Sequence, residues 1–187
     1  MGDPRRSRKK YHTPGHPYQK ARLESELVLM GKYGLRNKRE IWRARTKLGT
    51  YRKQARELLA LDPEEREIRG KIILDKLVRL GILSEGATTD DILALDVEDF
   101  LKRRLQTRVY ELGLAKTIYQ ARQMIVHRHI MYDGHIINAP SFLVPKDKEN
   151  TIQYAPDSPF NDPNHPMAVV GHMRAEEEPM EERGELR

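Results

Sequence analysis

Apolar side chains recur three or four positions apart over most of the first 125 residues, which predicts a mainly helical chain. Residues 38–60 show the pattern best, because their apolar or small positions form one stripe while Arg39, Arg43 and Lys47 recur every fourth place. Gly49 lies inside this segment, where it costs about 1 kcal/mol relative to alanine and is a candidate break point. The same spacing predicts helices over residues 21–31, 63–80 and 104–112, and two short helices within 88–105.

Capping residues indicate where several of these helices begin. Thr89 and Asp96 are the expected N-caps of the two short helices. The sequence TIYQ at residues 117–120 fits a capping box, in which Thr117 caps the next helix and Gln120 reaches back to the backbone. The buried stripe of that helix is expected at Ile118, Ala121 and Ile125.

The spacing changes from helical to alternating after His129. Ile130 and Tyr132 alternate with Met131, and Asp133–Gly134 is the dipeptide typical of a type I′ hairpin turn. The sequences FLV and TIQY, at residues 142–144 and 151–154, predict later strands. We therefore expect an α+β fold, in which an α-helical N-terminal domain precedes a small unit of two helices and a β-hairpin.

The two ends of the chain lack a periodic apolar pattern. Residues 1–20 are rich in proline, glycine and basic side chains, which favours an extended arm that a partner would order. Residues beyond 155 are rich in proline and acid and predict little regular structure. The expected organisation is an extended basic arm, a helical domain, the small α/β unit and a flexible acidic tail, at residues 1–20, 21–103, 104–155 and 156–187.

Charge divides the chain into basic and acidic territories. The 187 residues carry a net charge of +6, and 33% of them are charged. Residues 1–60 hold 17 basic and 5 acidic side chains, and residues 101–150 hold 9 and 4. The other two segments are acidic. Residues 61–100 hold 5 basic and 11 acidic side chains, and residues 151–187 hold 3 basic and 8 acidic side chains. Two separate basic territories favour a polyanionic partner, and structured RNA suits them because duplex RNA is recognised through its shape and its phosphates.

Several classes of function lack their sequence signals. The chain contains no cysteine, which excludes disulfides and thiolate metal sites and favours the cytoplasm. No apolar run approaches the roughly 20 residues of a membrane span, so we expect no membrane partner. We find no P-loop, G-x-G-x-x-G, H-E-x-x-H or G-x-S-x-G motif, and so expect no enzyme, no small-molecule substrate and no cofactor or metal.

The most specific sequence signal is RRLQTRVYELGLAKTIYQARQMIVHRHIMYDGHIINAPSFLV, which resembles the S-four (S4) RNA-binding domain. Two earlier stretches, YQKARLESELVLMGKYGLRNKREIWR and LALDVEDFLKRRLQT, resemble archaeal and eukaryotic members of the small-subunit ribosomal protein four family. Together these stretches cover roughly residues 18–154 in family order. The resemblance implies a primary rRNA-binding protein that nucleates assembly of the 5′ domain and contributes to decoding accuracy. It also implies a place near the mRNA entry, beside ribosomal proteins of families three and five.

The candidate RNA contacts are the cations and polar groups of the arm, the basic helix and the S4 domain. In the arm, Tyr11, His12 and Tyr18 are candidates for stacking on exposed bases. The Thr117 end of its helix would offer free N–H groups to a phosphate, and for His127 and His129 a metal-ligand role is the weaker alternative. The full set of candidates is Arg5, Arg6, Arg8, Lys9, Lys10, Arg36, Lys38, Arg39, Arg43, Lys47, Arg103, Arg104, Lys116, Thr117, Arg122, Gln123, His127, Arg128 and His129.

Two other functions stay open at this stage. S4 domains also occur as accessory modules of RNA-modifying enzymes, and a free-standing S4 protein could act as an RNA chaperone. An RNA-modifying enzyme would also need a catalytic partner, and no catalytic motif fits here. A free-standing chaperone would need only the S4 domain, whereas this chain also resembles the ribosomal family through its first hundred residues.

Overall fold

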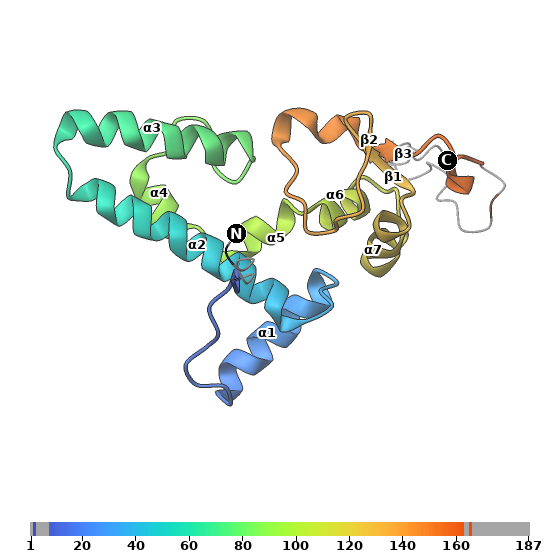
Figure 1. Cartoon of the computed structure of the whole chain (residues 1–187), viewed down its shortest axis with the longest axis horizontal. Helices are drawn as coiled ribbons and strands as arrows, with labels where there is room; N and C mark the ends of the chain where they lie inside the picture. Colours follow the sequence, from blue (N-terminus) through green and yellow to red (C-terminus); the bar gives the residue numbers. More distant parts are fainter. Residues whose placement is uncertain (1, 3–7, 163–164, 166–187) are drawn as a thin grey trace, which may run out of the picture.

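The computed structural model describes residue 2, residues 8–162 and residue 165. Helix α2 (Lys38–Leu59) is the framework of the first half, and it packs against α1 (Lys20–Lys32), α3 (Pro63–Arg79), α4 (Thr89–Ala94) and α5 (Val97–Lys102) (Figure 1). We call residues 20–102 the N-terminal lobe. Its core joins residues from Tyr33 to Leu101, with Ile41, Leu77 and Ile92 fully buried.

Residues 105–155 form the C-terminal lobe. Helices α6 (Leu105–Glu111) and α7 (Ile118–Val126) pack together beside a small antiparallel sheet of β1 (Ile130–Tyr132), β2 (His135–Ile136) and β3 (Gln153–Tyr154). The strand order is β2-β1-β3, and the register pairs Met131 with both Ile136 and Gln153. The 3₁₀ helices η1 (Lys146–Thr151) and η2 (Pro159–Asn161) lie before and after β3. The predicted α+β fold class is confirmed.

The C-terminal lobe has a hydrophobic core of its own, which joins residues from Leu105 to Ile152. Val109, Ala121, Ile125 and Ile130 are fully buried in it. The predicted stripe of α7 is confirmed at Ala121 and Ile125, whereas Ile118 is only half-buried and packs against the core of the N-terminal lobe.

Local sequence signals explain the hairpin turn and the starts of three helices. The hairpin turn has positive φ at both Asp133 and Gly134, as a type I′ turn requires. Asp96 begins α5 with a capping box as expected, but the cap of α4 is Thr88 rather than Thr89, because the Asp91 carboxylate reaches back to Thr88. Thr117 Oγ1 caps α7 by accepting from the backbone N–H of Gln120.

The structure decides one alternative that the sequence left open and overturns one expectation. Helix α2 runs without a break through Gly49, since its buried face continues on both sides of the glycine and tertiary packing outweighs the propensity cost. The sequence FLV forms no strand: Leu143 makes an isolated bridge with Arg104, and this bridge ties the segment to the junction between the lobes.

Part of the N-terminal arm contacts the N-terminal lobe. The Tyr11 ring lies 5.9 Å from the Trp42 ring, and the backbone N–H of His12 donates to Thr46 Oγ1 at 3.0 Å. Tyr18 is 90% exposed. The predicted contacts Arg5 and Arg6 and the predicted acidic tail beyond residue 165 lie outside the described residues.

Candidate nucleic-acid interface

A basic cleft of about 290 Å³ opens where the two lobes meet. Helix α2 forms one wall, and the end of α5, Arg104 before α6, residues 140–143 and Arg122 of α7 form the rest. Arg39, Arg43 and Lys47 line the α2 wall, because residues four apart in a helix lie above one another on the same face. The four-residue spacing of these basic residues in the sequence therefore places a row of cations along one cleft.

The part of the chain that the structure describes does not neutralise these three cations. Within residues 8–162, Arg39, Arg43 and Lys47 have no carboxylate partner, and all three are exposed at the cleft. Partial burial, which disfavours the charged amino group, together with the charges of Arg104 and Lys76, lowers the pKa of Lys47 below the ordinary lysine value. An anion bound in the cleft would relieve this repulsion.

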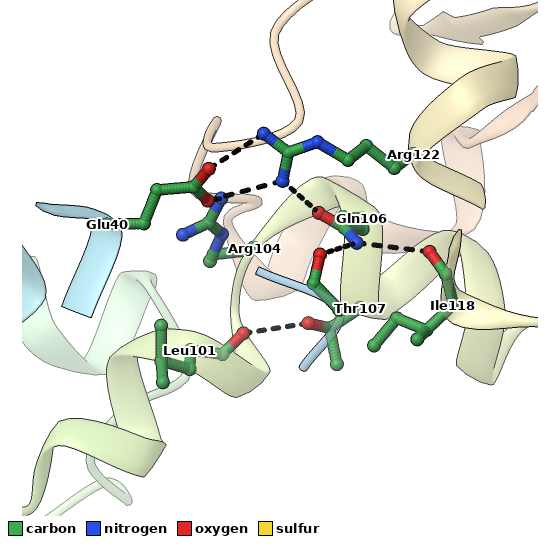
Figure 2. Close-up of polar contacts among 8 residues, drawn as sticks. Glu40, Leu101, Arg104, Gln106, Thr107, Ile118 and Arg122 are labelled. Carbon is green, nitrogen blue, oxygen red and sulfur yellow. Dashed lines mark hydrogen bonds and ion pairs between the residues drawn. The ribbon is translucent and has the colours of Figure 1, made fainter. Parts of the chain in front are cut away.

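The inner wall of the cleft is a buried ion-pair network around Glu40 (Figure 2). Arg104 donates to Glu40 Oε2, and Arg122 donates to Glu40 Oε1 at 2.7 Å and to Oε2 at 3.3 Å. Burial by itself would raise the pKa of Glu40, but the hydrogen bonds from Arg122 and the charge of Arg104 outweigh burial, so the pKa is lowered. The carboxylate is therefore charged at neutral pH and holds two arginines in fixed positions.

Gln106 extends this network to the backbone of both lobes. Its Oε1 accepts from Arg122 at 3.2 Å, and its Nε2 donates to the carbonyl oxygens of Gly34 at 2.9 Å and Ile118 at 3.0 Å. Gly34 has a φ of +56°, which glycine adopts at little cost. We call Glu40, Arg104, Gln106 and Arg122 the seam network, since it joins α2, α6 and α7 between the two hydrophobic cores.

Two of the predicted RNA contacts, Arg103 and Arg104, are not exposed on the surface. Both side chains are buried, 8% and 5% exposed. Arg103 donates to Glu149 Oε2 at 3.0 Å and to the carbonyl oxygen of Val144 at 2.9 Å, and Arg104 belongs to the seam network. These two arginines are internal because acids remote in sequence, at positions 40 and 149, compensate their charge.

A shallow groove continues the basic surface along α7 from the cleft. It is bounded by the Gly34–Arg36 turn and by α7, and it shares Arg122 with the cleft. Arg36, Gln123 and His127 are exposed along it. Lys116 and Thr117 are exposed at the start of α7, and Arg128 is exposed after its end, with a φ of +66°. Helix α7 and its two ends thus carry three of the nine cations of the second basic territory, Lys116, Arg122 and Arg128.

The predicted RNA-contact residues differ in how exposed they are in the structure. Lys38, Arg122 and His129 are half-buried, and Lys38 pairs with Glu26 at 3.6 Å. The RNA contacts themselves stay predictions for every residue of the set. The exposed members are Arg8, Lys9, Lys10, Arg36, Arg39, Arg43, Lys47, Lys116, Thr117, Gln123, His127 and Arg128.

Sequence reasoning missed the two buried acids that organise these cations, Glu40 and Glu26. Glu26 is fully buried and accepts from Trp42 Nε1 at 3.1 Å, with Arg22, Lys38 and Arg45 nearby. The sequence did contain a signal for these two acids, because only five acidic residues occur among the first 60 residues. Isolated acids in a strongly basic segment are candidates for internal ion pairs.

Neither a metal centre nor a membrane segment is apparent in the described part of the chain. Among residues 8–162, no group of three or more histidine, aspartate or glutamate side chains is placed to hold a metal ion. None of the described helices is both long and apolar enough to cross a membrane. The linings of the cleft and groove contain cations and side-chain amides, which suit phosphates.

Comparison with known proteins decides the family. The model of the ribosomal protein S4/S9 N-terminal domain matches residues 5–102, and that of the S4 domain matches residues 103–149. The small ribosomal subunit protein uS4 of Sulfurisphaera tokodaii is 52% identical over 172 residues, covering 91% of this chain and 96% of the relative. This chain belongs to the uS4 family of ribosomal proteins. The resemblance inferred from the residues is thus confirmed.

Two other uS4 proteins are similar over nearly their full length. The uS4 of Metallosphaera sedula is 53% identical, covering 95% of this chain and 98% of the relative, and that of Ignicoccus hospitalis is 55% identical, covering 86% and 96%. The uS4 family consists of structural ribosome components rather than enzymes. The two family matches meet between residues 102 and 103, where the chain passes from the N-terminal lobe to the seam.

Proposed function

We propose that this uS4 protein is a structural, RNA-binding constituent of the small ribosomal subunit, and that it grips rRNA with the basic cleft and the groove along α7. The observation that carries the proposal is the row of Arg39, Arg43 and Lys47, which have no carboxylate partner within residues 8–162. A row of fixed cations neutralises phosphates on one RNA strand, and the rigid walls select RNA of matching shape.

The seam network supports shape selection by holding the two lobes in one orientation. Because Glu40 and Gln106 bond to groups on α6, α7 and the α1–α2 turn, the cleft has defined walls before RNA arrives. We propose that the RNA is a multi-helix junction in the 5′ domain of small-subunit rRNA, which the protein stabilises in one fold during assembly. The match to uS4 proteins supports this assignment.

The proposal includes a contribution to decoding accuracy near the mRNA entry, beside ribosomal proteins of families three and five. Membership in the uS4 family supports this part. It is tested by misreading assays with subunits reconstituted with the wild type or with Arg39→Ala/Arg43→Ala. A raised error rate at equal subunit occupancy supports it, and an unchanged rate contradicts it.

The main experiment measures binding to the isolated rRNA 5′ domain across salt concentration, with unrelated duplex RNA of equal length as competitor. The Arg39→Ala/Arg43→Ala variant should bind more weakly and reduce the log–log salt slope by roughly 0.7 to 0.9 for each phosphate that is no longer neutralised. Lys53→Ala/Arg56→Ala is the matched control, because it removes two exposed cations from α2 away from the cleft.

Preference for the 5′ domain, lost in the cleft variant and kept in the control, supports the proposal. Equal affinity of the wild type for both RNAs would contradict it, because a general polycation binds without preference. Equally weakened binding in both variants would show that total charge, rather than the cleft, determines binding.

A further inference from the structure

A small pocket lies at the far end of the groove, between α7, the start of β1 and η2. Its volume is about 110 Å³. Met124, which is 2% exposed, forms part of its buried wall. The residues lining it are Gln120, Gln123, Met124, His127, His129 and Phe160.

The volume limits the class of ligand. It exceeds the roughly 30 Å³ that a water molecule occupies in the liquid, and it is well below the lower limit of about 300 Å³ for drug-sized ligand pockets. One planar ring system fits such a space, whereas a complete nucleotide or a folded peptide segment does not.

The lining suits an aromatic heterocycle. The His129 and Phe160 rings lie edge to face with centroids 4.9 Å apart, and the His127 ring is 6.4 Å from His129. Burial and the charge of His127 lower the pKa of His129, which favours its neutral form. The exposed amide of Gln123 offers both a donor and an acceptor at the rim. Aromatic faces with an amide at the edge are the groups that bind unstacked bases.

Hydrogen bonds within the protein hold the wall formed by η2 in place before any ligand binds. Ser158, which is 6% exposed, places its Oγ 3.3 Å from His129 Nδ1, and the backbone N–H of Ala155 donates to the His129 carbonyl at 2.8 Å. Asn161 Nδ2 donates to the Ala155 carbonyl at 2.8 Å. These bonds hold Phe160 over His129, so a ring entering the pocket meets a formed surface.

The pocket is continuous with the basic surface. It shares Gln123 and His127 with the groove, and the groove shares Arg122 with the cleft. No acidic side chain lines the pocket among the described residues. A strand whose phosphates followed the cations of the cleft and groove would therefore reach the pocket.

We propose that this pocket receives one unpaired base of the RNA whose backbone lies in the cleft and groove. The proposal rests on the proposed function and adds a base-recognising subsite to a surface that otherwise reads phosphates and shape. Stacking adds affinity without neutralising charge, which separates its contribution from that of the cations.

The test uses the full chain and the isolated rRNA 5′ domain. Phe160→Leu removes the ring but keeps an apolar side chain, and Phe160→Trp restores an aromatic face. Tyr110→Leu is the matched control, because Tyr110 is a 45% exposed aromatic on α6 that lines none of the three hollows. Gln123→Ala removes the amide from an exposed position, where the fold should tolerate the change.

Phe160→Leu should weaken binding by about 5-fold to 100-fold, the effect of removing one stacked base, with the salt slope unchanged. Phe160→Trp should recover most of the affinity, and Gln123→Ala should lower it in part. Base-specific chemical modification should show one unpaired nucleotide protected by the wild type and reactive with Phe160→Leu. A thermal melt of each variant confirms that it is folded.

The outcomes separate this proposal from the proposed function. Unchanged affinity and unchanged base reactivity with Phe160→Leu, while Arg39→Ala/Arg43→Ala still binds more weakly, would overturn the base pocket alone. The pocket would then take another ring, such as an aromatic side chain of a neighbouring protein. A wild type that shows no preference for the 5′ domain would overturn both proposals.

Discussion

The guanidinium of Arg104 donates a hydrogen bond to the carboxylate of Glu40, 64 positions earlier in the chain, and both side chains are less than a tenth exposed. Arg122 binds the same carboxylate from α7. Within the seam network Glu40 is the one acid facing two arginines, so its removal would leave two like charges together in a nearly dry site.

We expect Glu40→Gln to lower the free energy of unfolding by about 3 kcal/mol, since removing one partner of a buried pair leaves an uncompensated charge. Urea unfolding at pH 7 measures the change. Glu57→Gln is the control, because Glu57 pairs with Lys53 on the exposed side of α2, where such pairs contribute about 0 to 1 kcal/mol. Similar destabilisation in both variants would show that the seam network is not a special source of stability.

The stability that Glu40 contributes should depend on pH in the acidic range. Because the folded-state pKa of Glu40 lies below its ordinary value of 4.5, the contribution is complete above that value and is lost as the pH falls through the folded-state pKa. Urea unfolding between pH 7 and pH 3 should therefore show the gap between wild type and Glu40→Gln narrowing below about pH 4.5. A constant gap would contradict the lowered pKa.

Replacing Gly34 and Gly49 by alanine should change the stability of the fold in opposite directions. At Gly34 a Cβ would lie 2.7 Å from Gln106 Nε2 and 2.8 Å from Ile118 Cγ2, on a residue with φ of +56°. We expect Gly34→Ala to destabilise by more than about 1 kcal/mol. At Gly49 nothing lies within 4 Å of an added Cβ, so Gly49→Ala should stabilise α2 by about 0.5 to 1 kcal/mol. Thermal melts compare both variants, and a shift of the same sign in both would contradict this reasoning.

RNA binding should draw a proton onto Lys47 at alkaline pH. Its pKa is lowered by partial burial and by the charges of Arg104 and Lys76, and a bound phosphate would raise it again. Calorimetric titration at mildly alkaline pH, in two buffers of different ionisation enthalpy, should show net proton uptake. Lys47→Met should abolish that uptake, whereas Lys53→Met should not. Uptake that survives Lys47→Met would assign it to another group.

The sequence predicts the fold class well because its signals are local. The apolar stripe of α7, the cap at Thr117 and the Asp133–Gly134 turn each follow from a few neighbouring residues, and the structure contains them. The exposed row Arg39, Arg43 and Lys47 could be predicted for the same reason, since helical periodicity places all three on one face.

Neutralisation of charges by residues far away in the sequence limited the prediction of the site. Arg103 and Arg104 lie in the same kind of basic run as the exposed cations, and nothing nearby in sequence indicates that Glu149 and Glu40 will neutralise them. The same limit explains why Phe160 was not recognised, because only the folded chain brings η2 onto α7 and His129.

The sequence separation of the residues in the seam network also determines the order in which they become available during synthesis. Glu40 precedes its partner on α7 by 82 positions, so at about 5 to 20 residues per second it is synthesised roughly 4 to 16 seconds before Arg122. Until Arg104 has been made and can pair with it, the carboxylate must remain in water, because burial without a cation is costly. The N-terminal lobe can therefore complete its own core early, while the relative orientation of the lobes is settled only after α7 has been made.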